Sequence, residues 1–299
     1  MACAFGCIST EQSERWEIIV LANRDDICHI EPMISDNLKY VIRQFVERVL
    51  PACKPRELVI PTGTGKVVGL AGVRRSGKTF LFFDAIQRLA LQGVDRRRIV
   101  YLNFEDDRLH PIQAEELDLI LRCWHEVFPE MVGQHKYLFL DEVQNVSGWE
   151  RWIRRLCDTE DVEVFITGSS SQLLTRDLAT ALRGRSITLE VFPLSFREYL
   201  TFREIEVVPH SADNESRLRH ELESYLFCGG FPEIVLADEA LRPLILEEYS
   251  SLMLYRDVVE RYGVRNEKLM RDLLRHCFRN TGSLLNVSKL HRDFASLGY

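Results

Sequence analysis

The feature that most constrains this chain is a glycine-rich segment that directly follows a short apolar run. Residues 67–70 read VVGL, and residues 72–79 (GVRRSGKT) satisfy the pattern G-x-x-x-x-G-K-[ST] at every fixed position. Gly72 and Gly77 let the backbone turn where a side chain would block it, so that consecutive N–H groups can converge on an anion. The segment therefore predicts a strand and then a phosphate-binding loop.

The residues after this loop extend the prediction to a nucleotide and a metal ion. Residues 80–86 open a helix, whose N-terminal partial charge points at the same phosphates. Lys78 is expected to reach the β- and γ-phosphates, and the Thr79 hydroxyl is expected to bind Mg²⁺. The residues expected to hold the nucleotide are Gly72, Val73, Arg74, Arg75, Ser76, Gly77, Lys78 and Thr79.

Two carboxylates follow a second apolar run. Residues 137–140 (YLFL) precede Asp141 and Glu142, an arrangement that is the Walker B signature in proteins with a phosphate-binding loop. A buried strand would deliver Asp141 to the Mg²⁺ shell, and Glu142 would polarise the water that attacks the γ-phosphate. An ordinary strand that ends in an acidic turn would show the same pattern, but the loop upstream favours the catalytic interpretation.

Polar side chains also follow two further predicted strands. Residues 99–104 (IVYLNF) lead into the acidic residues 105–107, which either contact the waters of the metal or a partner, or form a solvated loop. Residues 162–167 (VEVFIT) end in hydroxyls. Thr167 and Ser169 are candidates for sensing the γ-phosphate or the attacking water, although serines at this point also suit the N-cap of a following helix.

Arginines precede the fifth predicted strand, at residues 187–191. Residues 178–185 fit a helix that ends in Arg-Gly-Arg. Arg185, or alternatively Arg183, is a candidate arginine finger that would neutralise transition-state charge on the γ-phosphate. The alternative is a basic helix C-terminus that interacts with the helix dipole.

The segments near the N-terminus are less informative. Residues 16–22 fit either a strand or a short helix. From Asp36, a plausible N-cap, apolar residues recur at helical spacing until Pro51, which predicts a helix beside the nucleotide domain. Residues 114–128 carry a second helical pattern.

The composition limits the class of protein to which the chain can belong and the cellular compartment expected for it. A chain of 299 residues can hold one large α/β domain and a smaller one, and its net charge of -7 argues against a protein that coats nucleic acid indiscriminately. Eight cysteines without a C-x-x-C pair suit reduced thiols, and the eight histidines form no H-E-x-x-H motif. Neither a signal peptide nor a membrane span is evident, which predicts a cytoplasmic protein without a membrane partner.

The motifs occur in an order that resembles a known family. The chain resembles the uncharacterised prokaryotic AAA-family ATPases of the STAND-like branch, in which the ATP-binding domain is normally followed by a C-terminal domain of unknown function. The resemblance covers roughly residue 37 to the end. It is carried by six ordered blocks: GVRRSGKT, YLNFEDDR, YLFLDEVQNVSGWERWIRRL, ITGSSSQLL, LRGRSITLEVFPLSFREYL and YLFCGGFPEIV.

The resemblance implies an α/β fold of the AAA type, a parallel sheet flanked by helices in which strand 162–167 lies between the P-loop strand and the Walker B strand. It also implies that residues 230–232 belong to a helical lid bordering the adenine, and that a winged-helix region begins near the end of the chain. The expected organisation is an unassigned N-terminal extension (1–35), an AAA-type core (36–193), a helical lid region (194–262) and the beginning of a winged-helix-like domain, apparently truncated (263–299).

The predicted function is binding and hydrolysis of ATP with Mg²⁺, coupled to conformational change of the lid and C-terminal region. The residues expected to take part in catalysis are Lys78, Glu142, Thr167, Ser169 and Arg185, with Thr79 and Asp141 on the metal. The alternative is a slow ATP-gated switch or DNA-associated regulator with little turnover. A small-molecule kinase is disfavoured because residues 195–262 offer no obvious basic lid for an acceptor. Expected partners are a second copy, through the arginine finger, and DNA or protein, through the C-terminal region.

Overall fold

The computed structural model describes residues 27–168, 182, 184–208, 211–260, 262–296 and 298, with side chains from Ile34 onward except that of Ala212. Contacts divide the chain into two units. One comprises Met1–Gly72 and Lys78–Val191, and the other comprises Val73–Gly77 and Phe192–Tyr299. Ser169, Arg183 and residues 16–22 lie outside the described residues.

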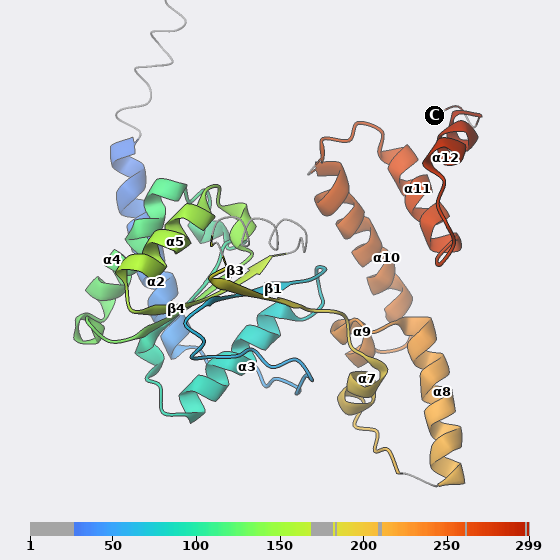
Figure 1. Cartoon of the computed structure of the whole chain (residues 1–299), viewed down its shortest axis with the longest axis horizontal. Coiled ribbons are helices and arrows are strands. Elements are labelled where there is room, and N and C mark those ends of the chain that lie inside the picture. The colour runs from blue at the N-terminus through green and yellow to red at the C-terminus, as the bar shows by residue number, and fades with distance from the viewer. Residues whose placement is uncertain are drawn as a thin grey trace, which may run out of the picture. The chain divides into compact units, whose positions relative to one another are not determined.

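A parallel five-stranded sheet organises the first unit (Figure 1). Its strands are β1 (Val67–Ala71), β2 (Ile99–Asn103), β3 (Lys136–Asp141), β4 (Val162–Gly168) and β5 (Ser186–Glu190). They lie in the order β2-β3-β4-β1-β5, and every neighbouring pair is parallel. The predicted α/β fold is confirmed, including the position of β4 between the P-loop strand and the Walker B strand. The carboxyl ends of the strands therefore meet at one edge of the sheet, where ligands bind in folds of this kind.

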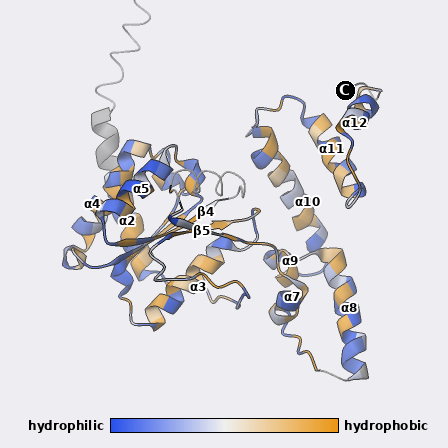
Figure 2. Ribbon diagram, viewed as in Figure 1, coloured by the Kyte–Doolittle hydropathy of each residue, from blue (hydrophilic) through white to orange (hydrophobic). Residues whose placement is uncertain are grey.

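Helices cover both faces of the sheet, which explains why the strands read as nearly continuous apolar runs. Helix α3 (Lys78–Leu91) packs on one face, where Phe82 contacts Phe139 and the Phe139 ring stacks on Phe165 at 4.4 Å between centroids. Helices α4 (Asp118–Val127) and α5 (Trp149–Thr159) join the core of the other face. Figure 2 shows both hydrophobic and hydrophilic residues along α3.

Helix α2 (Ile27–Glu47) packs beside β2 and α4. The predicted N-cap at Asp36 is wrong, because the helix begins at Ile27 and Asp36 lies inside it. The reason is visible at Ile34, which is 4% exposed and joins the same buried stripe as Leu38 and Ile42, so the apolar helical spacing starts before the acidic residue. The predicted domain boundaries stay predictions, and α2 runs across the one expected at residue 36.

The second unit is helical. Its elements are α7 (Phe196–Phe202), α8 (Ala212–Cys228), α9 (Pro232–Leu236), α10 (Arg242–Met253), a π-helical turn (Leu254–Glu260), α11 (Glu267–Arg279) and α12 (Val287–Ser296). Tyr199, Phe202, Ile234, Val235 and Tyr249 form the centre of its buried core. The predicted lid region (194–262) is therefore helical, whereas its role as a lid and the winged-helix assignment of α11 and α12 stay predictions.

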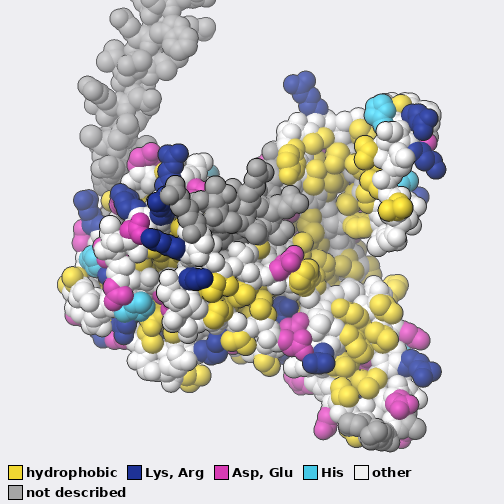
Figure 3. Space-filling view, in the orientation of Figure 1, with side chains coloured by type: hydrophobic (Ala, Val, Ile, Leu, Met, Phe, Trp, Pro, Cys, Tyr) yellow, Lys and Arg dark blue, Asp and Glu magenta, His cyan; other side chains and the backbone are white. Residues whose placement is uncertain are grey.

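Large apolar side chains are exposed toward the C-terminal end of this unit. Neither α11 nor α12 has a buried residue, and Phe278, Leu284 and Val287 are all exposed. Figure 3 shows hydrophobic side chains on the visible face of the C-terminal helices. Among the described residues, no helix is both long enough and apolar enough to cross a membrane.

A close backbone contact holds the start of α7 against the turn before α9. The Leu194 N–H donates to the Gly230 carbonyl at 2.6 Å, and a β-carbon added to Gly230 would lie 2.3 Å from the Leu194 carbonyl oxygen. The position therefore requires glycine for lack of space, not for its backbone conformation.

We expect Gly230→Ala to lower the free energy of unfolding by about 3 kcal/mol, because the obstructing atom belongs to the backbone and cannot rotate away. Denaturant unfolding followed by circular dichroism measures the loss. Gly63→Ala is the matched control, because a β-carbon there meets no atom within 4 Å and costs only the strain of its positive φ of 72°, about 1 kcal/mol. Equal losses of stability in the two variants would contradict the conclusion that lack of space requires glycine at position 230.

Candidate functional site

The predicted phosphate-binding loop leaves the sheet at its carboxyl edge. Gly72 follows β1, and Lys78 is the first residue of α3. Between them the backbone takes positive φ at Arg75 (66°) and at Gly77 (97°), so one non-glycine residue occupies the left-handed region. A turn of this kind directs backbone N–H groups into the space in front of a helix N-terminus, which is where an anion binds.

Lys78 is almost completely buried and its charge is paired. Its Nζ donates to the Gly72 carbonyl at 3.0 Å and lies 3.7 Å from Glu142 Oε1, and the residue is only 4% exposed. A buried ammonium is tolerated only with such partners. The structure thus brings Lys78 and Glu142, predicted from motifs more than sixty residues apart, into one site.

Asp141 accepts hydrogen bonds from three hydroxyl groups on three different elements. Thr79 Oγ1, in α3, donates to Oδ2 at 2.7 Å, Tyr101 OH, in β2, donates to the same oxygen at 3.0 Å, and Thr167 Oγ1, in β4, donates to Oδ1. The carboxylate is 1% exposed. Because a carboxylate accepts hydrogen bonds at both of its oxygens, this ring of donors suits the side chain of Asp141.

Thr167 connects the two carboxylate residues. Its hydroxyl donates to Asp141 and accepts the Glu142 backbone N–H at 2.9 Å. The single hydroxyl proton is therefore used inside the protein, and the direct contact of Thr167 with a phosphate or water stays a prediction. Ser169, the other sensor candidate, lies outside the described residues.

Glu142 follows β3 with a left-handed backbone, at φ 54° and ψ 45°. Its Oε2 accepts a hydrogen bond from Gln144 Nε2 at 2.6 Å, and its Oε1 faces Lys78. Burial raises the pKa of the Glu142 carboxyl, while the Lys78 charge and the Gln144 hydrogen bond oppose that rise. Strained backbone at a residue of this kind is typical of functional sites.

Sequence reasoning missed Tyr101 and Gln144. Tyr101 occupies a position in a mostly apolar run, residues 99–104, in which nothing distinguishes it from a core residue. The strand order would have been needed to show that its neighbour is the strand that carries Asp141. Gln144 carries no motif, and only the turn after β3 directs it toward Glu142.

The acidic residues after β2 differ in their contacts and in their exposure to solvent. Asp106 accepts the Arg108 N–H at 3.0 Å and forms an ion pair with the Arg108 guanidinium at 2.5 Å, which lowers the pKa of Asp106. This contact closes a local turn and favours the loop interpretation for Asp106. Glu105 is exposed.

Two arginines of the loop pair with acidic residues of the second unit, to which residues 73–77 belong by their contacts. Arg74 Nε lies 3.3 Å from Asp257 Oδ1, and Arg75 Nη1 lies 3.5 Å from Glu233 Oε2. The Arg75 guanidinium also lies over the Tyr249 ring. Neither side chain was predicted to have a protein partner.

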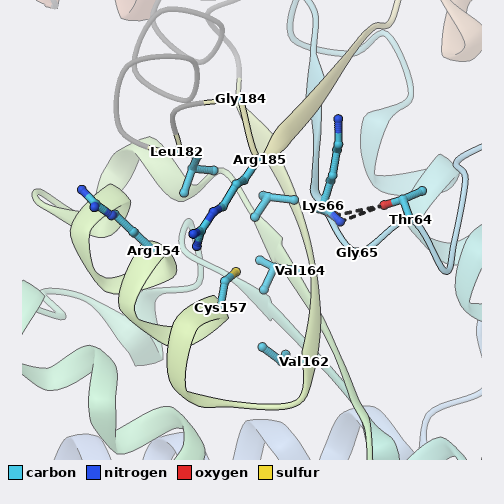
Figure 4. A pocket seen from close by; sticks show the side chains of 11 residues that line it. Thr64, Gly65, Lys66, Arg154, Cys157, Val162, Val164, Leu182, Gly184 and Arg185 are labelled. Carbon is cyan, nitrogen blue, oxygen red and sulfur yellow. Dashed lines mark hydrogen bonds between the residues drawn. The ribbon is translucent and has the colours of Figure 1, made fainter.

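Arg185 lies at the amino edge of the sheet (Figure 4). β1 and β5 are parallel with Val67 opposite Ser186, so Arg185 is level with Lys66, roughly 16 Å of strand away from the loop that follows β1. There it pairs with Asp158 and lines a cavity of about 390 Å³ together with Lys66 and Cys157. An arginine-finger role for Arg185 therefore stays a prediction.

The donor set at the carboxyl edge fits a nucleoside triphosphate with Mg²⁺. Lys78 supplies a buried cation beside the phosphate-binding turn, and Thr79 and Asp141 supply a hydroxyl and a carboxylate oxygen within 2.7 Å of each other. Oxygen ligands of this kind, few in number, are what Mg²⁺ prefers when substrate phosphates complete its shell.

A parallel sheet in this strand order, with a phosphate-binding loop after β1 and paired carboxylates after β3, defines a P-loop protein of the AAA type. The sequence profile of an AAA domain matches residues 64–200, and a profile described as a domain of unknown function matches residues 219–296. The chain thus carries an AAA domain followed by a domain of unknown function, and the resemblance predicted from the ordered motifs is confirmed.

The curated relatives are uncharacterised prokaryotic proteins. One from Methanocaldococcus jannaschii is 36% identical over 269 residues, which is 88% of this chain and 57% of the relative. One from Haemophilus influenzae is 34% identical over 230 residues, covering 76% of this chain and 54% of the relative. The chain therefore spans little more than half the length of these relatives.

Solved structures are similar only at a low level. PCH-2 of C. elegans matches at 13% identity with a TM-score of 0.39, covering 73% of this chain and 62% of that protein. A similarity of this size adds nothing to the fold described above.

We expect Thr167→Val to lower the free energy of unfolding by about 1–3 kcal/mol, because it removes a donor to Asp141 and leaves the buried Glu142 N–H without its acceptor. Urea unfolding measures the change. Thr167→Ser keeps the hydroxyl and serves as the control, with a smaller expected loss. A loss as large in the serine variant would show that the methyl group, not the hydroxyl, matters.

Proposed function

We propose that this chain binds ATP with Mg²⁺ and hydrolyses it. The observation that carries the proposal is the presence at the carboxyl edge of the sheet of two close pairs, Thr79 with Asp141 at 2.7 Å and Lys78 with Glu142 at 3.7 Å. The match of residues 64–200 to an AAA domain supports it. ATP is preferred over GTP because no guanine-type motif follows the Walker B strand.

Each residue of the site has a role that follows from its chemistry. Lys78 and the backbone amides of the loop bind the phosphates, and Thr79 and Asp141 hold the metal ion, which supplies charge neutralisation on the phosphate oxygens when bound. Glu142 orients the attacking water and accepts its proton. Burial raises the pKa of this carboxyl, which makes it a stronger base than an exposed glutamate.

Coupling to the C-terminal helices is part of the proposal. What supports it is that residues 73–77, which join Gly72 to Lys78 and would surround the phosphates, have their contacts with the second unit, through Arg74 and Arg75. Binding of phosphate at these residues would therefore change the charge beside Asp257 and Glu233. DNA or a protein partner of the C-terminal region, and self-association through Arg185, stay predictions.

A slow ATP-gated switch is the second candidate, and the contacts of Glu142 favour it. Both carboxylate oxygens are engaged, one by Gln144 and the other by Lys78. Both contacts lower the pKa of the Glu142 carboxyl and so oppose the effect of burial, which would slow turnover without weakening binding.

We expect Lys78→Ala to weaken ATP binding by about 100-fold, because the charge that meets the phosphates is lost. Binding is measured with a fluorescent ATP analogue, and the circular dichroism spectrum reports whether the fold is retained. Lys66→Ala, which removes an exposed lysine at the opposite edge of the sheet, is the control. Unchanged ATP affinity in Lys78→Ala would refute the assignment of the loop.

Glu142→Gln is expected to keep ATP affinity within about threefold while turnover falls at least 100-fold, because the amide cannot accept the proton from water. Steady-state phosphate release and equilibrium ATP binding are measured side by side, with the surface variant Glu130→Gln as the control. Equal turnover in the natural chain and Glu142→Gln would remove Glu142 from catalysis. Tight binding without turnover in the natural chain would favour the switch.

A further inference from the structure

Tyr101 lies beside the metal-binding carboxylate without belonging to any of the motifs. In the parallel pairing of β2 with β3, Tyr101 is opposite Phe139, and Asp141 comes two residues later on the same face. A tyrosine side chain is long enough to reach this diagonal neighbour. Its hydroxyl does so, donating to Asp141 Oδ2 at 3.0 Å.

Two aromatic rings pack against the ring of Tyr101. Phe45 of α2 lies 5.2 Å from it and Phe83 of α3 lies 5.3 Å from it, measured between ring centroids. The helix that supplies Phe83 also supplies Thr79, the predicted metal ligand. The phenol oxygen therefore has a fixed place relative to both groups that would hold the metal ion.

The hydrogen bonds to Asp141 leave its carboxylate little freedom. An ionised carboxylate has about four acceptor positions, two on each oxygen. Among the described residues, Thr79 and Tyr101 donate to Oδ2 and Thr167 donates to Oδ1. Without Tyr101, the Thr79 and Thr167 hydroxyls would remain. Both of these rotate freely about their own bonds, whereas a phenol hydrogen prefers the plane of its ring, and this ring packs against Phe45 and Phe83.

We propose that Tyr101 is a positioning residue for Mg²⁺ binding, which holds the Asp141 carboxylate in the orientation that the metal ion requires. The inference rests on the proposed function, since it concerns the same site.

A purely structural role makes a different prediction. If the hydroxyl of Tyr101 only satisfied its own need for a partner in the core, its removal would lower stability and leave the metal dependence of nucleotide binding unchanged. If the Tyr101 hydroxyl positions Asp141, its removal raises the Mg²⁺ concentration at which nucleotide binding reaches half of its metal-dependent increase. Residues that orient a metal ligand typically change metal affinity by 10- to 100-fold when replaced.

The test is the affinity for a fluorescent ATP analogue measured across a Mg²⁺ series and with chelator alone, for the natural chain, Tyr101→Phe and Tyr137→Phe. Tyr137 is the matched control because it lies in the same sheet, at the amino end of β3, with its ring against His135. We expect about a 10-fold rise in the half-saturating Mg²⁺ concentration for Tyr101→Phe only, and metal-free affinity within about twofold in all three proteins.

Several outcomes would overturn the proposal. If the half-saturating Mg²⁺ concentration of Tyr101→Phe is unchanged, Tyr101 has only a structural role, whether or not the unfolding temperature is lowered. No nucleotide binding, or no Mg²⁺ effect in the natural chain, refutes the proposed function itself and is seen without any variant. If Tyr101→Phe does not fold, Phe45→Leu loosens the ring and keeps the hydroxyl. For Phe45→Leu we expect about a threefold rise in the half-saturating Mg²⁺ concentration. An unchanged concentration in this variant would overturn the proposal.

Discussion

The structure of the site depends on the accommodation of one buried carboxylate. Asp141 is 1% exposed, and no basic side chain forms an ion pair with it among the described residues. Its charge is instead balanced by hydroxyl groups from α3, β2 and β4, which fixes how these three elements meet at the carboxyl edge of the sheet. A buried charge that lacks such donors would cost several kcal/mol, so the packing around Asp141 and its chemistry cannot be separated.

The neighbouring buried charges are arranged differently. Lys78 and Glu142 face each other, and each has a further polar partner, the Gly72 carbonyl and the Gln144 amide. The site therefore contains one carboxylate held by neutral donors and one held near a cation. This difference in surroundings suits the two roles proposed for them, since a metal ligand needs a fixed orientation and a base needs a pKa suited to accepting a proton.

The loop residues are assigned to a unit that differs from that of their neighbours along the chain. The loop residues 73–77 belong by contact to the helical unit, although they join two elements of the sheet unit. The helical unit also carries exposed apolar residues on α11 and α12, and the curated relatives are nearly twice as long as the aligned region.

The sequence by itself determined the strands, the loop, the two carboxylates and the AAA-type class, because each depends on local periodicity or on residues at fixed spacing. It did not determine that α2 begins before Asp36, since an N-cap residue is also tolerated inside a helix when the apolar stripe continues through it. The contacts of Tyr101 with Asp141 and of Gln144 with Glu142 were decided by the tertiary structure alone. So was the placement of Arg185 at the far edge of the sheet, because strand order and direction bring residues together, or keep them apart, without any trace in the spacing along the chain.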